Sequence, residues 1–223
     1  ENYILPIQIT KLDIENIYLK NRTKINYTMI HKSPKVGVIN GLWANAHGMG
    51  GVIPIQTFYY PSNNLLELKL TGMQGDVMKE SMNVAKTLAW NLSSAKNKKP
   101  LIDKKNNEKG LHIHCPEGAV PKDGPSAGTA ITTTIYSLIN NKKIKNDTAI
   151  TGEINLQGMV TEIGGLELKI LGGIRAGVKT FIYPKSNKKD FDKFLEKYPN
   201  IDLSNITFHH VSTIDEVLKL VFI

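Results

Sequence analysis

The sequence predicts an α/β fold in which mixed strands form a sheet that is flanked by helices. The first observation is an alternation, after residue 34, of short stretches rich in Val, Ile, Leu and aromatic residues with longer stretches whose apolar residues lie three or four positions apart. The second is the placement of Gly, Pro, Asn and Ser between these stretches. Strands and helices that alternate along a chain are typical of α/β domains.

The composition is that of a globular protein of 223 residues, of which 41% are hydrophobic and 22% are charged. No apolar run approaches the roughly 18 residues of a membrane-spanning helix, so we expect no membrane association. The single cysteine, Cys115, excludes an intrachain disulfide. The net charge of +8 is compatible with an anionic partner, but the lysines lie in scattered polar clusters without aromatic neighbours, which favours solvated loops over a nucleic-acid site.

Residues 1–33 are expected to form a lead-in segment, and residues 34–223 a single domain. The stretch from Ile9 to Pro34 mixes polar and apolar positions without a clean period, whereas strand-like sequence begins directly after Pro34. The chain begins with Glu1 and not with Met, so we expect it to be a piece of a longer protein.

Three strand-like segments open the domain, at residues 36–43, 52–60 and 65–72. Residues 44–51 (ANAHGMGG) predict a long flexible loop between the first two. Asp76 then lies at a capping position, and a stripe of apolar residues predicts a helix of about five turns. This stripe consists of Met78, Met82, Ala85, Ala89 and Leu92.

The rest of the domain continues the alternation. Residues 93–110 are polar and predict a loop, and residues 111–114 predict a strand that leads into the loop PEGAVPKDGPSAG. The remaining elements are expected, in order, as a helix from Ser126 to Asn140, a strand at 148–154, a short strand after Gly158, a helix at 166–176, a strand at 180–184, a helix at 188–196, a strand at 207–211 and a capped helix from Thr213. No G-x-x-x-x-G-K-[ST] sequence occurs, so we expect no nucleotide hydrolysis by this piece alone.

Ser126 is a candidate nucleophile because it follows a proline at the start of a predicted helix and has small neighbours. Small residues allow a substrate backbone to approach, and the first amides of a helix can donate hydrogen bonds to a developing oxyanion. The alternative is that Ser126 only caps the helix.

A histidine is the usual base for a catalytic serine. His112 and His114 share one face of a predicted strand, and other histidines lie at 31, 47, 209 and 210. A Ser-His-Asp set is not excluded, but no G-x-S-x-G sequence supports it. The two strand histidines could also bind metal, although a solvated strand face is favoured because no third ligand lies at a usable spacing.

Lys169 is a candidate general base because apolar residues enclose it on a predicted helix, in the sequence IGGLELKILGG. Burial lowers the pKa of a lysine and makes it a base near neutral pH. Gly165, Gly172 and Gly173 would allow other backbone to approach this helix. The alternative is a lysine that extends its ammonium group to solvent.

The segments PKDGPSAG and TGEINLQGMVTEIGGLELK together resemble the active-site region of Lon proteases, whose catalytic dyad is Ser plus Lys. Ser126 and Lys169 match these positions and are 43 residues apart, as the family requires. VGVINGLW, TGMQGDVMKES and HIHCPEGAVPKDG match further, in the same order along the chain. The resemblance implies an ATP-dependent serine endopeptidase of the Lon proteolytic-domain fold that degrades misfolded or regulatory proteins.

The resemblance also implies supporting roles for two residues. The hydroxyl of Thr151 would orient the lysine, and Asp123 would lie in a loop that can approach the dyad. Two features depart from the family pattern: Thr129 replaces a residue that is usually apolar, and residues 44–51 are longer than the corresponding loop in many relatives. Both departures are expected to affect substrate entry and not the dyad.

For the whole protein, the resemblance implies a homohexameric ring, unfolded polypeptide substrates and an ATPase module that uses ATP and Mg. Residues 1–33 would then come from the end of that module, and no cofactor or metal is expected in the proteolytic domain itself. Nucleic-acid binding by the full-length protein is a further implied partnership. A eukaryotic source, which we favour, implies the mitochondrial matrix, and a bacterial source implies the cytoplasm.

Two alternatives compete with a protease. A Lon-like domain without activity could serve as an oligomerisation scaffold, although the chain retains both Ser126 and Lys169. A basic nucleic-acid-binding module would show salt-sensitive binding that depends on the lysine clusters and not on Ser126.

Overall fold

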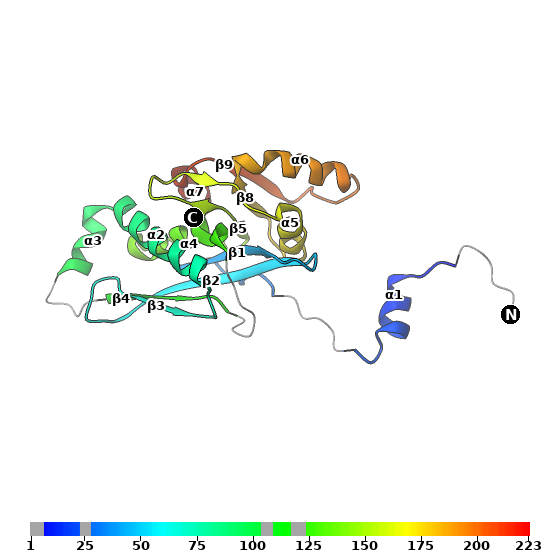
Figure 1. Ribbon diagram of the computed structural model, residues 1–223, viewed down its shortest axis with the longest axis horizontal. Helices are drawn as coiled ribbons and strands as arrows, with labels where there is room; N and C mark the ends of the chain where they lie inside the picture. The colour runs from blue at the N-terminus through cyan, green and yellow to red at the C-terminus, as the bar shows by residue number, and fades with distance from the viewer. Residues whose placement is uncertain (1–6, 23–27, 104–108, 117–123) are drawn as a thin grey trace.

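The computed structural model describes residues 7–22, 28–103, 109–116 and 124–223. Its main feature is a mixed seven-stranded sheet in the order β3-β4-β2-β1-β5-β8-β9 (Figure 1). The strands are β1 (Val38–Ala44), β2 (Gly50–Pro61), β3 (Leu68–Thr71), β4 (Lys109–His114), β5 (Thr148–Ile150), β8 (Thr180–Pro184) and β9 (Thr207–Val211). A separate two-stranded sheet joins β6 (Glu153–Ile154) to β7 (Val160–Thr161).

The helices flank this sheet, so the predicted α/β fold is confirmed. They are α1 (Lys11–Asp13), α2 (Asp76–Leu92), α3 (Ala95–Ile102), α4 (Gly128–Asn140), α5 (Leu166–Arg175), α6 (Lys188–Lys197) and α7 (Ile214–Val221). Three short turns complete the list: the π-helical η1 (Ile14–Tyr18) and the 3₁₀ turns η2 (Pro125–Ala127) and η3 (Lys185–Asn187).

The strands on the two sides of β1 pair differently, apart from the edge strand β3, which pairs parallel with β4. β1 pairs antiparallel with β2, and β2 pairs antiparallel with β4. On the other side of β1, the strands β5, β8 and β9 all run parallel to their neighbours. Parallel strands require crossover connections, and here α5 and α6 lie in the segments between β5, β8 and β9.

Apolar residues fill both faces of the sheet because neighbouring residues of a strand point to opposite sides. Ile150 and Ile182 belong to a core that packs under α2, α4 and α7. Ala149 and Phe181, one position earlier in the same strands, belong to a second core under α5 and α6. The helices in Figure 1 accordingly cover the sheet from two sides.

The loop predicted at residues 93–110 is wrong in part, because α3 lies within it. The hydroxyl of Ser94 accepts a hydrogen bond from the Asn97 backbone N–H and caps the helix. Leu101 is buried and anchors α3 to the core. The lysine-rich composition and the internal Pro100 hid a short helix that its cap, the buried Leu101 and a hydrogen bond from Asn97 to Asn140 hold in place.

The predicted flexible loop at residues 44–51 is instead a compact hairpin turn. Gly50 and Gly51 belong to β2, and Ala44 pairs with Gly50. The side-chain oxygen of Asn45 accepts hydrogen bonds from the backbone N–H groups of His47 and Met49, both at 3.0 Å. This turn chemistry closes the hairpin over residues 45–49.

Two other predicted features are corrected. The helix α2 is capped by Gly75 and not by Asp76, which is its first residue. The predicted strand at 148–154 is interrupted: β5 ends at Ile150 and β6 begins at Glu153. The two residues between these strands, Thr151 and Gly152, leave the main sheet and lie beside Ser126.

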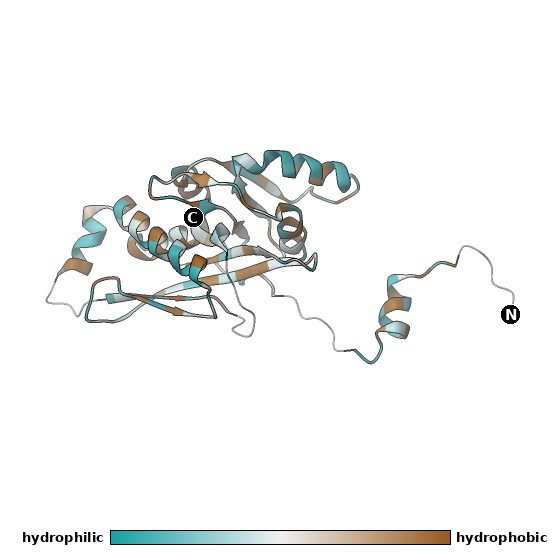
Figure 2. Ribbon diagram, in the orientation of Figure 1, coloured by the Kyte–Doolittle hydropathy of each residue, from teal (hydrophilic) through white to brown (hydrophobic). Residues whose placement is uncertain are grey.

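The segment with α1 and η1 lies apart from the body of the protein (Figure 1) and buries none of its residues. Figure 2 shows that this segment nevertheless carries hydrophobic residues. By contrast, the backbone N–H of Ile30 donates to the carbonyl of Ala176, so the end of the lead-in contacts the domain. The division at residues 33 and 34 stays a prediction.

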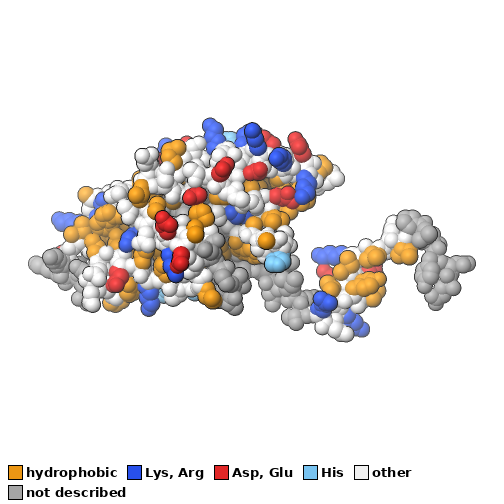
Figure 3. All heavy atoms as spheres, viewed as in Figure 1, with side chains coloured by type: hydrophobic (Ala, Val, Ile, Leu, Met, Phe, Trp, Pro, Cys, Tyr) orange, Lys and Arg blue, Asp and Glu red, His pale blue; other side chains and the backbone are white. Residues whose placement is uncertain are grey.

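The charged side chains do not gather by sign on the face shown in Figure 3, where Lys and Arg alternate with Asp and Glu over α6. One reason is the pairing of opposite charges along the helix, as in the Lys188–Asp192 ion pair at 2.8 Å. Within the described part of the chain, the helices are all too short or too polar to cross a membrane.

Candidate active site

Ser126 lies in the 3₁₀ turn η2, directly before α4, and is half-buried. The sequence predicted that Ser126 begins the helix, and the first turn is in fact 3₁₀ with Pro125 at its first position. The helix that follows is almost entirely buried, including its threonines. Thr132 and Thr133 satisfy their hydroxyls by donating to the carbonyls of residues four positions earlier. Ser126 therefore sits at the exposed end of a rigid, buried helix.

Thr151 and Gly152 connect the end of β5 to this turn. The Gly152 N–H donates to the Ser126 carbonyl at 2.8 Å, and the Thr151 hydroxyl lies 3.4 Å from the same oxygen. In return, the Thr129 N–H donates to the Gly152 carbonyl at 3.0 Å. The Thr151 N–H donates to Ile182 in β8 at 3.1 Å. The backbone of Ser126 is thus held against the central strands.

Lys169 approaches the same threonine from α5. Its side chain is only 3% exposed, and its Nζ donates to the Thr151 hydroxyl oxygen at 3.1 Å. The ammonium group does not extend to solvent, so burial lowers the pKa of Lys169 to about 8. Thr151 therefore links Lys169 to the turn that carries Ser126, and the structure brings these three predicted residues together.

Close backbone packing fixes the position of α5. A Cβ atom on Gly172 would lie 2.2 Å from the carbonyl carbon of Gly50, and one on Gly50 would lie 2.1 Å from the carbonyl oxygen of Leu168. The Arg175 guanidinium also donates to the Gly50 carbonyl at 2.9 Å. The hairpin glycines and Gly172 thus allow β2 to contact α5 directly, as the glycine pattern around Lys169 predicted.

The two histidines of β4, His112 and His114, are engaged elsewhere. The Thr71 hydroxyl oxygen lies 2.9 Å from His112 Nε2 and 2.7 Å from His114 Nδ1. Both histidines of β4 therefore bond to the edge strand β3. Burial lowers the pKa of His112. Among the residues that the structure describes, no hydrogen bond joins a histidine to Ser126, and no cluster of three His, Cys, Asp or Glu side chains could hold a metal ion.

Asp123, the second supporting residue of the sequence analysis, lies outside the described residues. Gly152 is a residue that the sequence analysis missed. Its two hydrogen bonds involve only backbone atoms, which leave no mark on residue type except the absence of a side chain. Its position directly after Thr151, in the TGE sequence, is the one signal that could have drawn attention to it.

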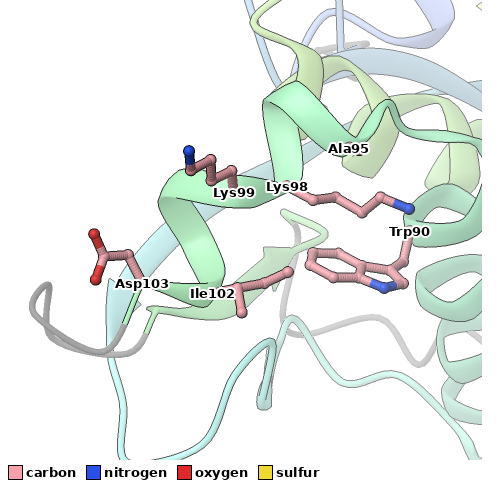
Figure 4. A pocket seen from close by; sticks show the side chains of 6 residues that line it. All are labelled: Trp90, Ala95, Lys98, Lys99, Ile102 and Asp103. Atoms are coloured by element: carbon pink, nitrogen blue, oxygen red, sulfur yellow. The ribbon is translucent and has the colours of Figure 1, made fainter.

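A groove of about 610 Å³ lies between α2 and α3 and does not coincide with this site (Figure 4). It is lined by Trp90, Ala95, Lys98, Lys99, Ile102 and Asp103. The Lys98 ammonium lies 5.2 Å from the centre of the Trp90 ring, a cation–π contact at the surface. No predicted site residue lines this groove.

Comparisons with known proteins identify the family of this chain. Residues 8–223 match the family described as Lon protease (S16) C-terminal proteolytic domain. The chain is 41% identical over 217 residues to a Lon protease homolog of Acanthamoeba polyphaga mimivirus, and 39% identical over 221 residues to the Lon protease of Clostridium acetobutylicum. Each alignment covers 95% of this chain.

A third relative, a mitochondrial Lon protease homolog of Phaeodactylum tricornutum, is 42% identical over 156 residues, which are 70% of this chain and 17% of the relative. The chain spans only 21% of the mimivirus protein and 27% of the clostridial one. The match thus covers nearly the whole chain but a minor part of each relative. The fold, the site and these comparisons establish that the chain belongs to the family of Lon protease C-terminal proteolytic domains.

Proposed function

We propose that the chain hydrolyses peptide bonds, with Ser126 as the nucleophile and Lys169 as the general base. The observation that carries the proposal is the position of Lys169: a nearly fully buried amine with a pKa of about 8, bonded to a threonine that also contacts the Ser126 turn. An amine with this pKa is substantially neutral near pH 8 and accepts a proton there.

In the proposed reaction, neutral Lys169 removes the proton of the Ser126 hydroxyl while Oγ bonds to the carbonyl carbon of the substrate. Lys169 then gives this proton to the leaving amine as the peptide C–N bond breaks. Water, deprotonated by Lys169, then attacks the carbonyl carbon of the resulting ester. As the bond between this carbon and Ser126 Oγ breaks, Lys169 returns the proton to Oγ and the carboxylic acid product leaves. The amine thus alternates between base and acid, as its pKa near the working pH allows.

The negative charge of the tetrahedral intermediate needs hydrogen-bond donors close to Ser126. The N–H groups of Gly128 and Thr129 already donate to the carbonyls of Pro125 and Gly152. The Ala127 N–H is likewise engaged in the 3₁₀ turn, so we assign the oxyanion to the backbone N–H of Ser126, where the positive end of the α4 dipole adds to its effect.

Thr151 is proposed to orient Lys169, because its oxygen accepts a hydrogen bond from the amine at 3.1 Å. Asp123 keeps its proposed place in a loop near the dyad, on the resemblance alone. No metal or cofactor is proposed for this domain.

For the whole protein, we propose ATP-dependent degradation of unfolded polypeptides by a homohexameric ring. The chain spans only about a quarter of the length of the relatives. The proposal for the whole protein therefore rests on family membership. An ATPase module that binds ATP and Mg would precede residue 34. If the source is eukaryotic, we place the protein in the mitochondrial matrix, as one relative is named mitochondrial; cell fractionation tests this location.

The dyad is tested by Ser126→Ala and Lys169→Met in the full-length protein, with casein and a fluorogenic peptide as substrates. Both variants are expected to lose hydrolysis, because each removes a group that the covalent step requires. Ser186→Ala and Lys193→Met, which change exposed residues of the same types on η3 and α6, serve as matched controls. Undiminished turnover in either dyad variant would contradict the proposal, and an inactive wild-type protein would favour the scaffold alternative.

A further inference from the structure

The two residues between β5 and β6 bond to three separate parts of the site. Thr151 donates from its backbone to Ile182 in β8 and accepts from Lys169 in α5. Gly152 donates from its N–H to Ser126 and accepts at its carbonyl from Thr129. Both residues are buried. Thr151 and Gly152 therefore determine how Ser126 and Lys169 lie relative to each other.

Gly152 bonds both to the turn that carries Ser126 and to the first turn of α4. Its N–H reaches the carbonyl of Ser126 at 2.8 Å, and its carbonyl receives the N–H of Thr129 at 3.0 Å, three residues further on. These two bonds tie η2 and the first turn of α4 to one residue and so fix the rotation of η2 about the α4 axis. A turn that rotates by a small angle would displace the Ser126 hydroxyl while the helix itself stays folded.

The contact leaves no room for a side chain at position 152. A Cβ atom there would lie 2.7 Å from the Thr129 hydroxyl oxygen and 2.7 Å from a methyl group of Val160. Thr129 belongs to the buried helix α4 and Val160 to β7, so neither neighbour is a flexible surface chain. The neighbouring Gly128 shows the same closeness, because its Cβ would lie 3.0 Å from a methyl group of Ile154.

We propose that Gly152 is a positioning residue for the Ser126 nucleophile: its missing side chain lets the segment between β5 and β6 approach α4 closely enough for its two backbone bonds to set the serine against Lys169. Gly152 itself touches no reacting atom. The inference rests on the proposed function, since it assumes that Ser126 is the nucleophile.

The test is Gly152→Ala in the full-length protein, with hydrolysis of a fluorogenic peptide and acylation by a fluorophosphonate probe as two readouts. A displacement near 1 Å can reduce a rate by about 100-fold, so we expect kcat and the acylation rate to fall by about this factor. KM is expected to change by less than about threefold, and the probe should still label every folded chain, only more slowly. A merely structural role would lower the labelled fraction and leave the rate of the labelled molecules unchanged.

A relieved background, in which the side chains that would crowd a Cβ at position 152 are shortened, makes the test specific. Thr129→Ala and Val160→Ala together remove the oxygen and the methyl group that a Cβ at position 152 would meet. Adding Gly152→Ala to this background is expected to cost less than about threefold in acylation rate, against about 100-fold in the wild-type background. Gly164→Ala is the matched control, because its Cβ would meet nothing within 4 Å.

The outcomes separate the inference from the proposed function. Wild-type acylation by Gly152→Ala, an equal loss in both backgrounds, or a reduced labelled fraction at an unchanged rate would overturn the positioning role. Undiminished labelling of Ser126→Ala would overturn the proposed function instead. Slow, complete labelling of Gly152→Ala that the relieved background restores supports both.

Discussion

Two lysines of this chain lie beside apolar surfaces, and the structure gives them different chemistry. Lys169 on α5 is 3% exposed, donates to the Thr151 hydroxyl and has a pKa that burial lowers to about 8. Lys98 on α3 lies at the surface, with its ammonium 5.2 Å from the centre of the Trp90 ring. Lys169 thus owes its lowered pKa to its burial in the core.

The α2–α3 groove and the Ser126 site differ in the same way. The α2–α3 groove has two lysines and an aromatic ring, and the Lys98 side chain extends toward Trp90 (Figure 4). The Ser126 site has one lysine, and its neighbours are fixed by backbone hydrogen bonds from β5, β8 and α4. Chemistry at such a site depends on fixed geometry, so changes there are expected to have far larger effects than changes in the groove.

Thr151→Val is expected to have a large effect although it keeps both members of the dyad. The change keeps the shape of a fully buried residue and removes the oxygen that binds Lys169 Nζ. A hydrogen bond to a charged group contributes about 1.5–3 kcal/mol, which corresponds to roughly 10- to 100-fold in kcat. Peptide hydrolysis measures the loss, and Thr151→Ser, which keeps the hydroxyl, should retain most of the activity. Equal losses in both variants would show that the hydroxyl is not the important group.

Lys169→Met is expected to raise stability while it removes activity. The pKa of Lys169 is lower in the folded state than its ordinary 10.5, so the unfolded chain binds the proton more tightly. Below about pH 8 both states are protonated, and the folded state carries the full cost of a buried ammonium, up to about 3 kcal/mol. This cost disappears as the pH rises from about 8 to 10.5.

Urea unfolding at several pH values measures this difference. Lys169→Met should exceed the wild type in unfolding free energy by a constant amount below pH 8, and the gap should close toward pH 10.5. Lys193→Met, on the exposed face of α6, should show no such gap. If Lys169→Met were less stable than the wild type at pH 7, burial of the ammonium group would not be what destabilises the folded wild type.

Reversing the charge of the groove is expected to have the smallest effect. In Lys98→Glu/Lys99→Glu, peptide hydrolysis should stay within about twofold of the wild type, because single exposed charges contribute little and no dyad residue lines the groove. If the full-length protein binds nucleic acid, the same variant tests the basic-module alternative, through the salt dependence of DNA binding. A large loss of hydrolysis would show that the groove and the site are coupled.

Much of the site could be predicted from the sequence because its chemistry depends on residue types. A serine at a helix start and a lysine among apolar residues were recognisable, and the resemblance to Lon proteases joined them. The burial of Lys169 and its bond to Thr151 agree with the environment that the sequence predicts. Most strands and helices were also recognisable from their apolar spacing, including α2 and α7.

The remaining features depend on contacts that residue type does not encode. The helix α3 is polar and contains Pro100, and a cap with one buried leucine stabilises it. The hairpin at residues 45–49 closes through the Asn45 side chain, and Gly50 at its end serves the contact with α5. Gly152 acts through backbone atoms alone, and only the folded arrangement shows which groups it meets.

The pH dependence of serine acylation tests the central claim most directly. The second-order rate of fluorophosphonate labelling, measured from pH 5.5 to 10 in the full-length protein, reports the ionisation of the base in the free enzyme. A buried lysine predicts a rate that rises through a single ionisation near pH 8, because only the neutral amine accepts the Ser126 proton. A rise centred near pH 6.5, the ordinary pKa of histidine, would contradict the assignment of Lys169 as the base.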